Sequence, residues 1–405
     1  MMIKRDYYLN KLIYYKDKDL IKVITGIRRV GKSFLLFNLY YDYLIKSGIN
    51  QSNIIKINLE SDKMKTLRDP VELSKYVNSK INSNDKYYLL IDEIQHVNDF
   101  EDVINGLRVD LNVDIYLTGS NSKLLSSDIN TKLRGRSIEI KLYPLSFFEY
   151  HNYYQGDLDD DFKEYLLYGG LPYLINEDDS NGKIAYLKMI NETVVIKDIV
   201  ERHKIRNPHF FNAVYEFLCS NIGSYVSAYK IANTLKSNGY KTITSDTVSN
   251  YLEFLTNAYL FYKVNRYDVK GKAYLKTQNK YYASDIGMRN AKINYRQLEI
   301  THTLENIIYL ELLRRGYIVD IGKNYNSEID FIAKNKQDTY YLQVSYTIND
   351  PNIKERELKA FKNLADGYKK IVLTMDKDPY LHLENGYKKV NIIDFLLKED
   401  ILELI

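Results

Sequence analysis

The first third of the chain alternates short apolar runs with segments of helical periodicity. Short, mainly apolar runs stand at Ile21–Thr25, Tyr87–Ile91 and Val113–Leu117, and a leucine-rich and aromatic helical pattern follows the first of them at Ser33–Ile45. Mainly apolar runs of this length are typical of parallel strands that are buried on both faces. The pattern therefore predicts an α/β domain with a doubly wound parallel sheet, which we place at residues 1–144.

The remaining pattern divides into three parts. Residues 145–207 are mostly helical, with a break at "GGLP", and we interpret them as a helical lid or connector. Residues 208–292 predict two helices, one capped by Ser227 and one capped near Ser245, and then a hairpin, which together form a winged-helix arrangement. Residues 293–405 predict a helix, two strands and a further helix, and thus a C-terminal α/β domain.

Composition and charge narrow the class of protein. A chain of 405 residues with 45% hydrophobic and 27% charged residues has ordinary globular composition and suits two or three domains. The net charge of +4 permits a local basic face but argues against a polycation. One cysteine, Cys219, excludes an intramolecular disulfide and a cysteine-based zinc cluster. Because the chain has a charged start and no apolar run of about 18 residues, we expect a cytoplasmic protein without a membrane partner.

A glycine-rich octet joins the first apolar run to the helix after it. Strand, loop and helix in this order are the context of a Walker A phosphate-binding loop, in which glycines let the backbone fold tightly around phosphate. Lys32 would contact the outer phosphates and Ser33 would ligate Mg²⁺, so ATP and Mg²⁺ are the predicted cofactors. The predicted nucleotide-binding residues are Gly26, Ile27, Arg28, Arg29, Val30, Gly31, Lys32 and Ser33.

Two adjacent carboxylates, Asp92 and Glu93, close the second apolar run. Burying them without a partner would be unfavourable, whereas at the carboxyl end of a parallel sheet they meet a metal ion and a water, as in a Walker B segment. We therefore expect Asp92 to hold the Mg²⁺ and Glu93 to polarise the attacking water. A solvated pair of acids at the end of a strand is the alternative.

Polar residues also follow the third apolar run and precede a later strand. Ser120 and Asn121 would face the γ-phosphate and orient the water, although Ser120 would serve equally as a helix cap. Arg134 and Arg136 stand just before the predicted strand Ser137–Leu142. Either arginine is a candidate arginine finger, a residue that would act on the nucleotide bound by a neighbouring subunit, and this role predicts a homo-oligomer. A solvated arginine is the alternative.

These motifs carry a family resemblance. "GIRRVGKS", "LLIDEIQ", "LTGSNS" and "LRGR" with "LYPLSFFEY" resemble, in order and spacing, the bacterial and archaeal AAA-type P-loop ATPases that are fused to a DUF4143 region. "YLLYGGLPYLI", "KDIVERHKIRN" and "KYYASDIGMRNA" are similar to the middle segments of that family. The resemblance implies an ATPase, and its later motifs imply no chemistry of their own.

The predicted winged helix raises the question of its partner. In DNA-binding versions the second helix enters the major groove. Protein docking is the alternative here, because this helix carries Asp246 and Glu253 and little positive charge to neutralise phosphates. The candidates for DNA contact are Lys241, Thr242, Thr244, Ser245, Thr247 and Asn250.

The C-terminal part resembles a PD-(D/E)XK nuclease core, the fold of restriction endonucleases. Glu305 and Asp330 match its helix acid and strand aspartate, whereas Gln343 and Ser345 stand where the carboxylate and lysine of E-x-K belong. Gln343 would offer a metal only a neutral oxygen, so we expect a scaffold that does not cleave DNA efficiently.

The leading interpretation is a Mg²⁺-dependent ATPase whose nucleotide state repositions the winged-helix and nuclease-like modules, with DNA as the candidate target. An ATP-regulated metal-dependent endonuclease and a slow nucleotide switch that binds protein partners are the two alternatives. The residues at Gln343 and Ser345 argue against the endonuclease.

Overall fold

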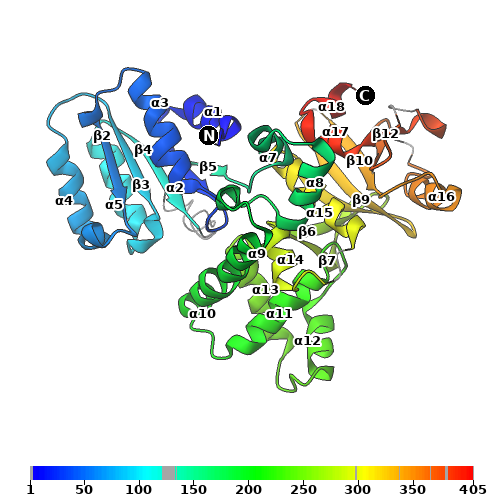
Figure 1. Cartoon of the computed structure of the whole chain (residues 1–405). Helices are drawn as coiled ribbons and strands as arrows, with labels where there is room; N and C mark the ends of the chain where they lie inside the picture. Colours follow the sequence, from blue (N-terminus) through cyan, green and yellow to red (C-terminus); the bar gives the residue numbers. More distant parts are fainter. Residues whose placement is uncertain are drawn as a thin grey trace. The chain divides into compact units, whose positions relative to one another are not determined.

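The chain forms two compact units, which Figure 1 shows in the computed structural model. The structure describes residues 3–120, 133, 135–296, 299–336, 338–364, 366–378 and 382–404. One unit holds Met1–Tyr143 and Asn257–Tyr259, and the other holds Pro144–Thr256 and Leu260–Ile405. The second unit contains the three segments that the sequence pattern divides at residues 207 and 292, and that finer division stays a prediction.

The first unit is built on a five-stranded sheet in which every strand is parallel to its neighbours. The strand order is β2-β3-β4-β1-β5, so the strand before the glycine-rich loop lies between β4 and β5. This arrangement confirms the predicted parallel α/β sheet. The strands are β1 (Ile21–Thr25), β2 (Ile54–Asn58), β3 (Tyr87–Asp92), β4 (Val113–Gly119) and β5 (Ser137–Lys141).

The predicted helix after the glycine-rich loop forms, but it is not α-helical throughout. It begins as α2 (Lys32–Phe34), continues as a π-helix at Leu35–Tyr40 and ends as α3 (Tyr41–Lys46). The other helices of this unit are α1 (Asp6–Tyr15), α4 (Pro70–Lys80) and α5 (Phe100–Asp110), with 3₁₀ turns at Gln51–Asn53, Asp62–Arg68 and Ile94–His96.

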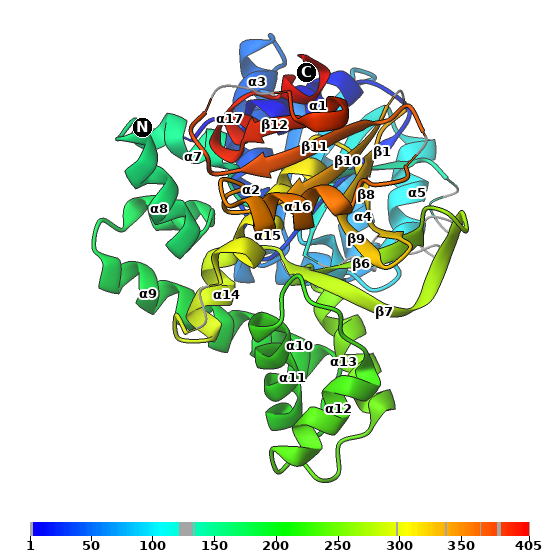
Figure 2. The same ribbon diagram turned by 90° about the vertical axis from the view of Figure 1, so that its right-hand side faces the viewer.

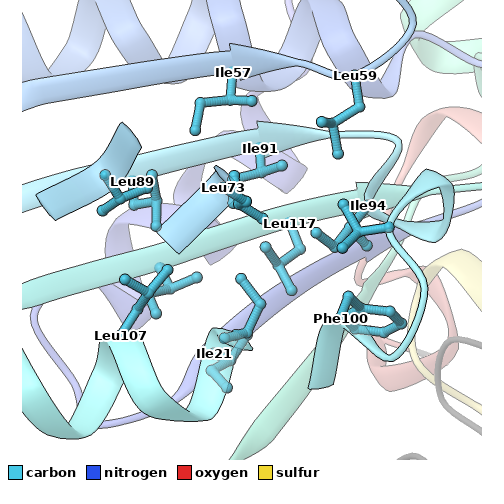
Figure 3. Close-up of a cluster of buried hydrophobic side chains, with 14 of the residues drawn as sticks. Ile21, Ile57, Leu59, Leu73, Leu89, Ile91, Ile94, Phe100, Leu107 and Leu117 are labelled. Atoms are coloured by element: carbon cyan, nitrogen blue, oxygen red, sulfur yellow. The ribbon is translucent and has the colours of Figure 1, made fainter. Parts of the chain in front are cut away.

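Apolar side chains cover both faces of the sheet, which explains why its strands are continuous apolar runs. Figure 3 shows one face, where Leu117 of β4 belongs to the same buried cluster as Leu73 of α4 and Leu107 of α5. On the other face Tyr116 packs against Tyr40 of the π-helix, with ring centroids 4.6 Å apart. Successive residues of one strand point to opposite faces, so a strand buried on both sides carries no polar alternation.

The second unit begins with helices where the connector was predicted. These helices contact α14 (Ile286–Lys292), which comes from much later in the chain and is buried along nearly its whole length. The connector consists of α7 (Phe147–Tyr154), α8 (Leu158–Tyr168), a 3₁₀ turn at Pro172–Asn176, α9 (Ser180–Met189), a π-helix at Ile190–Ile196 and α10 (Lys197–Arg202).

A buried carboxylate joins the "GGLP" break to α14. Asp285 caps α14 by accepting a hydrogen bond from the backbone N–H of Met288 at 2.8 Å, and its other oxygen accepts from that of Gly170 at 2.8 Å. A Cβ on Gly287 would lie 1.8 Å from the carbonyl oxygen of Tyr168, so only glycine permits this approach. The motifs "YLLYGGLPYLI" and "KYYASDIGMRNA", which contain no evident chemistry, thus pack against each other.

Three helices and a hairpin follow, of which the sequence predicted the second and third helices and the hairpin. Ser227 caps α12, accepting from the backbone N–H of Lys230, and Val226 forms a bridge to Asn279 of the hairpin. Figure 2 shows the three helices gathered below the long strand β7. The elements are α11 (Pro208–Ser220), α12 (Ala228–Ser237), α13 (Ser245–Asn257), β6 (Phe261–Asp268) and β7 (Ala273–Ala283).

The hairpin does not stand apart from the C-terminal strands. Besides pairing with β7, β6 pairs in parallel with β8 (Ile318–Asn324), so one mixed sheet has the order β12-β11-β10-β9-β8-β6-β7. The predicted helix, two strands and helix are α15, β9, β10 and α16, while β8, β11 and β12 were not predicted. The remaining elements are β9 (Ser327–Lys334), β10 (Thr339–Val344), β11 (Lys369–Thr374), β12 (Lys388–Asn391), α15 (Ile300–Arg314), α16 (Pro351–Lys359), α17 (Ile392–Leu397), α18 (Ile401–Leu404) and a 3₁₀ turn at Glu384–Gly386.

We expect the substitution Asp285→Ala to destabilise the second unit by about 2–4 kcal/mol, because it leaves buried N–H donors without an acceptor and removes a helix cap. Urea unfolding followed by circular dichroism measures this loss. The matched control is Glu355→Ala, which removes an acid from an exposed position of α16 and should change stability little. Equal midpoints for the two variants would contradict the role assigned to Asp285.

Candidate functional site

The glycine-rich loop leaves the carboxyl end of β1 in a conformation that needs glycine. Gly26 has φ +144° and Gly31 has φ +95°, both in the region that favours residues without a Cβ. A Cβ on Gly26 would lie 2.3 Å from the carbonyl oxygen of Leu142, the residue that follows β5. The loop is therefore held close against its neighbouring strand end.

Lys32 lies inside this loop. Its Nζ donates to the carbonyl oxygens of Gly26 at 3.1 Å and Ile27 at 3.2 Å, and it lies 3.8 Å from the carboxylate of Glu93. Burial lowers the pKa of Lys32, and the carboxylates of Glu93 and Asp92 act in the opposite direction. The loop lysine and the two acids after β3 thus belong to one site.

Asp92 is the centre of a small hydrogen-bonded group at the end of β3. One of its oxygens accepts from the Ser33 hydroxyl at 2.9 Å and from the Thr118 hydroxyl at 2.5 Å. Burial raises the pKa of Asp92, while these two hydrogen bonds act to lower it. A serine hydroxyl and a carboxylate side by side are hard oxygen ligands, so their chemistry fits Mg²⁺.

Glu93 is held in a left-handed backbone conformation, with φ +55° and ψ +53°. Its backbone N–H donates to the Thr118 hydroxyl at 2.9 Å, and its carboxylate accepts from the side chain of Gln95 and from the Ser120 hydroxyl at 3.3 Å. A non-glycine residue in this region is strained and persists only where its surroundings fix it. Contacts from both β4 and the turn after β3 therefore set the direction of this carboxylate.

The structure brings some predicted site residues together and separates one of them. Ser120 lies beside Glu93, whereas Asn121 and Arg134 lie outside the described residues. Arg136 precedes Ser137, which is paired with Ile21 at the amino end of β1, so it lies at the sheet edge opposite to the glycine-rich loop. Its guanidinium lies 3.5 Å from Asp19 and is half exposed. Arg136 is therefore not part of the site of its own chain.

Sequence reasoning did not assign Thr118 and Gln95 to the site. Thr118 was visible as a polar residue at the end of the third apolar run, and Gln95 as the last residue of "DEIQ". Thr118 reaches Asp92 and Glu93 only through the pairing of β3 with β4. Gln95 bonds Glu93, two residues earlier, in a turn whose left-handed backbone no sequence pattern predicts.

The helix α13 and the turn before it carry the polar residues that were predicted to contact a partner. All six are exposed or half-exposed, and two of them, Thr244 and Thr247, also form its cap: the backbone N–H of Thr247 donates to the Thr244 hydroxyl at 3.1 Å. Asp246 is exposed on the same turn. The surface is polar without being strongly basic.

The C-terminal unit brings Glu305 and Asp330 into one buried cluster with Lys280 of β7. The Nζ of Lys280 lies 2.6 Å from Glu328 and 3.6 Å from Glu305, and the Tyr282 hydroxyl donates to Glu305 at 3.0 Å. Burial acts to lower the pKa of Lys280, but the carboxylates of Glu305 and Glu328 outweigh it and raise that pKa. Burial, and then repulsion from Glu305, raise the pKa of Asp330.

Gln343 does not extend an oxygen to this cluster. Its Oε1 accepts from the backbone N–H of Asp330 at 2.8 Å, and its Nε2 donates to Glu357 at 2.9 Å. Among the described residues, no three histidine, cysteine or acidic side chains are arranged to hold a metal ion. Gln343 thus does not supply the metal ligand that the carboxylate of E-x-K provides in a PD-(D/E)XK nuclease.

No helix within the described part of the chain combines the length and apolar character needed to cross a membrane.

Two family models match the chain. The model of an AAA domain matches residues 18–151, and that of a domain of unknown function, DUF8612, matches residues 159–299. The latter replaces the DUF4143 region expected from sequence. Two of the motifs that suggested DUF4143 pack around Asp285. Because their role is packing, they do not distinguish the DUF4143 family from the DUF8612 family.

Comparison with known proteins identifies two long relatives and one similar structure. An uncharacterized protein of Haemophilus influenzae is 40% identical over 403 residues, 98% of this chain and 99% of that protein. The uncharacterized protein MJ1544 of Methanocaldococcus jannaschii is 31% identical over 100% of this chain and 90% of that protein. The Walker-type ATPase paby2304 of Pyrococcus abyssi shares the fold at a TM-score of 0.50 and 16% identity, covering 72% of this chain and 96% of that one. The chain belongs to the same family as these two relatives, and it carries an AAA-type P-loop ATPase domain followed by a DUF8612 domain.

Proposed function

We propose that this protein binds ATP with Mg²⁺ at the glycine-rich loop and hydrolyses it. The observation that carries the proposal is the meeting of four side chains from two strand ends, Lys32 and Ser33 beside the loop and Asp92 and Glu93 after β3. The match of residues 18–151 to an AAA domain supports the same chemistry.

Each of these side chains has a role that its position supports. The loop N–H groups and Lys32 bind the phosphates, while Ser33 and Asp92 hold Mg²⁺, which supplies charge neutralisation on the phosphates when bound. Glu93 accepts a proton from the attacking water, and the contacts from Gln95 and Ser120 orient its carboxylate for that transfer.

Replacing Lys32 and replacing Glu93 should have different effects on ATP binding and hydrolysis. Lys32→Ala should lose ATP binding, because it removes the charge that meets phosphate directly. Glu93→Gln should keep ATP and slow hydrolysis by roughly a hundredfold or more, as expected for loss of a general base. Equilibrium binding of a labelled nucleotide and phosphate release measure the two effects. Lys75→Ala, at an exposed lysine of α4, is the matched control, and unchanged binding and turnover in both site variants would refute the ATPase.

An arginine from a neighbouring subunit completes the site in this proposal. Lys32 lies next to Glu93, whereas Arg136 lies at the opposite edge of its own sheet. The position of Arg136 thus supports action in trans, and Arg134, two residues earlier, is the other candidate. Self-association would then be a condition for rapid hydrolysis.

Removing the finger should slow hydrolysis by on the order of a thousandfold while ATP binding changes little, because the guanidinium acts on charge that develops in the transition state. The experiment mixes Glu93→Gln subunits with Arg134→Ala or Arg136→Ala subunits, each inactive alone. Recovered activity shows a shared site. If both arginine variants stay fully active as dilute monomers, each chain completes its own site.

We further propose that the nucleotide state repositions a winged-helix module on DNA. The order α11, α12, α13 and hairpin supports this module, as does the bridge between Val226 and Asn279. The exposed residues Lys241 and Asn250 would contact the duplex. The acids Asp246 and Glu253 favour the rival partner, a protein.

Duplex DNA should stimulate ATP hydrolysis severalfold, and a Lys241→Ala, Asn250→Ala variant should lose the stimulation while keeping its basal rate. Lys163→Ala, at an exposed lysine of α8, is the matched control and should respond to DNA like the wild type. If DNA has no effect and the ATP-bound Glu93→Gln protein co-purifies with a protein instead, the DNA target is wrong and the protein-binding switch is correct.

A further inference from the structure

The cluster of Glu305, Glu328 and Asp330 contains a cation, Lys280, that does not belong to the PD-(D/E)XK motif. In that motif the lysine stands two residues after a carboxylate on the same strand, and here that position is Ser345, whose hydroxyl donates to the carbonyl of Thr347. Lys280 instead comes from β7, in the hairpin that adds to the far end of the sheet. Its side chain is 5% exposed, so the ammonium is buried, as is the side chain of Glu305, whereas the side chain of Glu328 is 30% exposed.

The acids of the cluster face this ammonium from two elements. Glu305 comes from α15, and Glu328 and Asp330 come from β9, where residues two apart point to the same face. Lys280 lies 2.6 Å from Glu328 and 3.6 Å from Glu305, so it forms a direct ion pair with one acid and faces the other. Buried carboxylates require such a partner.

The other donors of the motif are engaged within the protein. One oxygen of Asp330 accepts from the backbone N–H of Val344 at 2.8 Å, and Gln343 bonds both the backbone of Asp330 and Glu357. A divalent ion held by Glu305 and Asp330 would lie close to a buried positive charge, which repels it.

We propose that Lys280 is a built-in cation that takes the place of the divalent metal in this nuclease-like fold. The ammonium pairs with Glu328 and offsets part of the negative charge of Glu305 without an ion from solution, and it joins the hairpin to α15 and β9. The C-terminal domain is thereby a metal-independent scaffold. This inference stands apart from ATP hydrolysis, because every group that it uses belongs to the second unit.

The test is Mn²⁺ binding, counted by electron paramagnetic resonance in nucleotide-free protein. All proteins carry Asp92→Asn, which removes the proposed metal ligand of the first unit. The protein with Lys280 should bind no Mn²⁺ at the cluster, whereas Lys280→Met should bind it with affinity greater by on the order of tenfold or more, and Mn²⁺ should raise the melting temperature of that variant alone.

Two further variants keep the proposal falsifiable. Lys280→Arg, the matched control, retains a cation and should remain without Mn²⁺. If Lys280→Met does not fold, adding Glu305→Gln should restore folding by removing an uncompensated acid, and failure to do so would overturn the neutralising role. Mn²⁺ binding by the protein with Lys280 that disappears on Asp330→Asn would overturn the proposal, and so would Mn²⁺-dependent DNA cleavage by that protein.

Discussion

The parallel pairing of β1, β3 and β4 is the constraint on which the first unit depends. Because these strands run in one direction, the glycine-rich loop, the acids after β3 and Thr118 near the end of β4 must meet at one edge of the sheet. The Thr118 hydroxyl accepts from the N–H of Glu93 and donates to Asp92, so β4 fixes both acids. The candidate site is thus positioned by strand ends, which are more rigid than loops.

A second constraint acts in both units: a buried charge needs a partner, and that partner often comes from a distant segment. Asp285 obtains backbone N–H donors from α14 and from Gly170, which stands 115 positions earlier. Lys280 obtains the carboxylates of Glu305 and Glu328. Each of these groups adds a polar link between elements that also pack together, as the stacked rings of Tyr282 and Tyr309 do for β7 and α15, so polar burial adds to apolar packing in the second unit.

The same physics explains what the sequence could predict. The glycine-rich loop and the strands β1, β3, β4 and β5 follow from local pattern, since strand, loop and helix are consecutive, whereas β2 was not predicted. Gln95 was missed because its bond to Glu93 depends on the left-handed backbone of that residue, and Lys280 was missed because its partners come from other elements. β8 was missed because "IVDIGKN" lacks a continuous apolar run. Arg136 lies at the sheet edge opposite to the glycine-rich loop because of the register of β5 with β1, and this register cannot be read from the spacing of residues in the sequence.

The two acidic clusters of this chain place a lysine differently, and the difference separates their chemistry. In the first unit Lys32 bonds to its own loop, and within the described part of the chain Asp92 accepts hydrogen bonds from two neutral hydroxyls. A metal ion can displace such hydroxyls or bind beside them. In the second unit Lys280 lies 2.6 Å from Glu328, within direct hydrogen-bonding distance, and Asp330 accepts from the backbone N–H of Val344. A carboxylate that is paired with a fixed ammonium gains less from a metal ion. The partners of the acids therefore favour metal-assisted chemistry at the first cluster and a structural role for the second, although the lysine lies at similar distances from Glu93 and from Glu305.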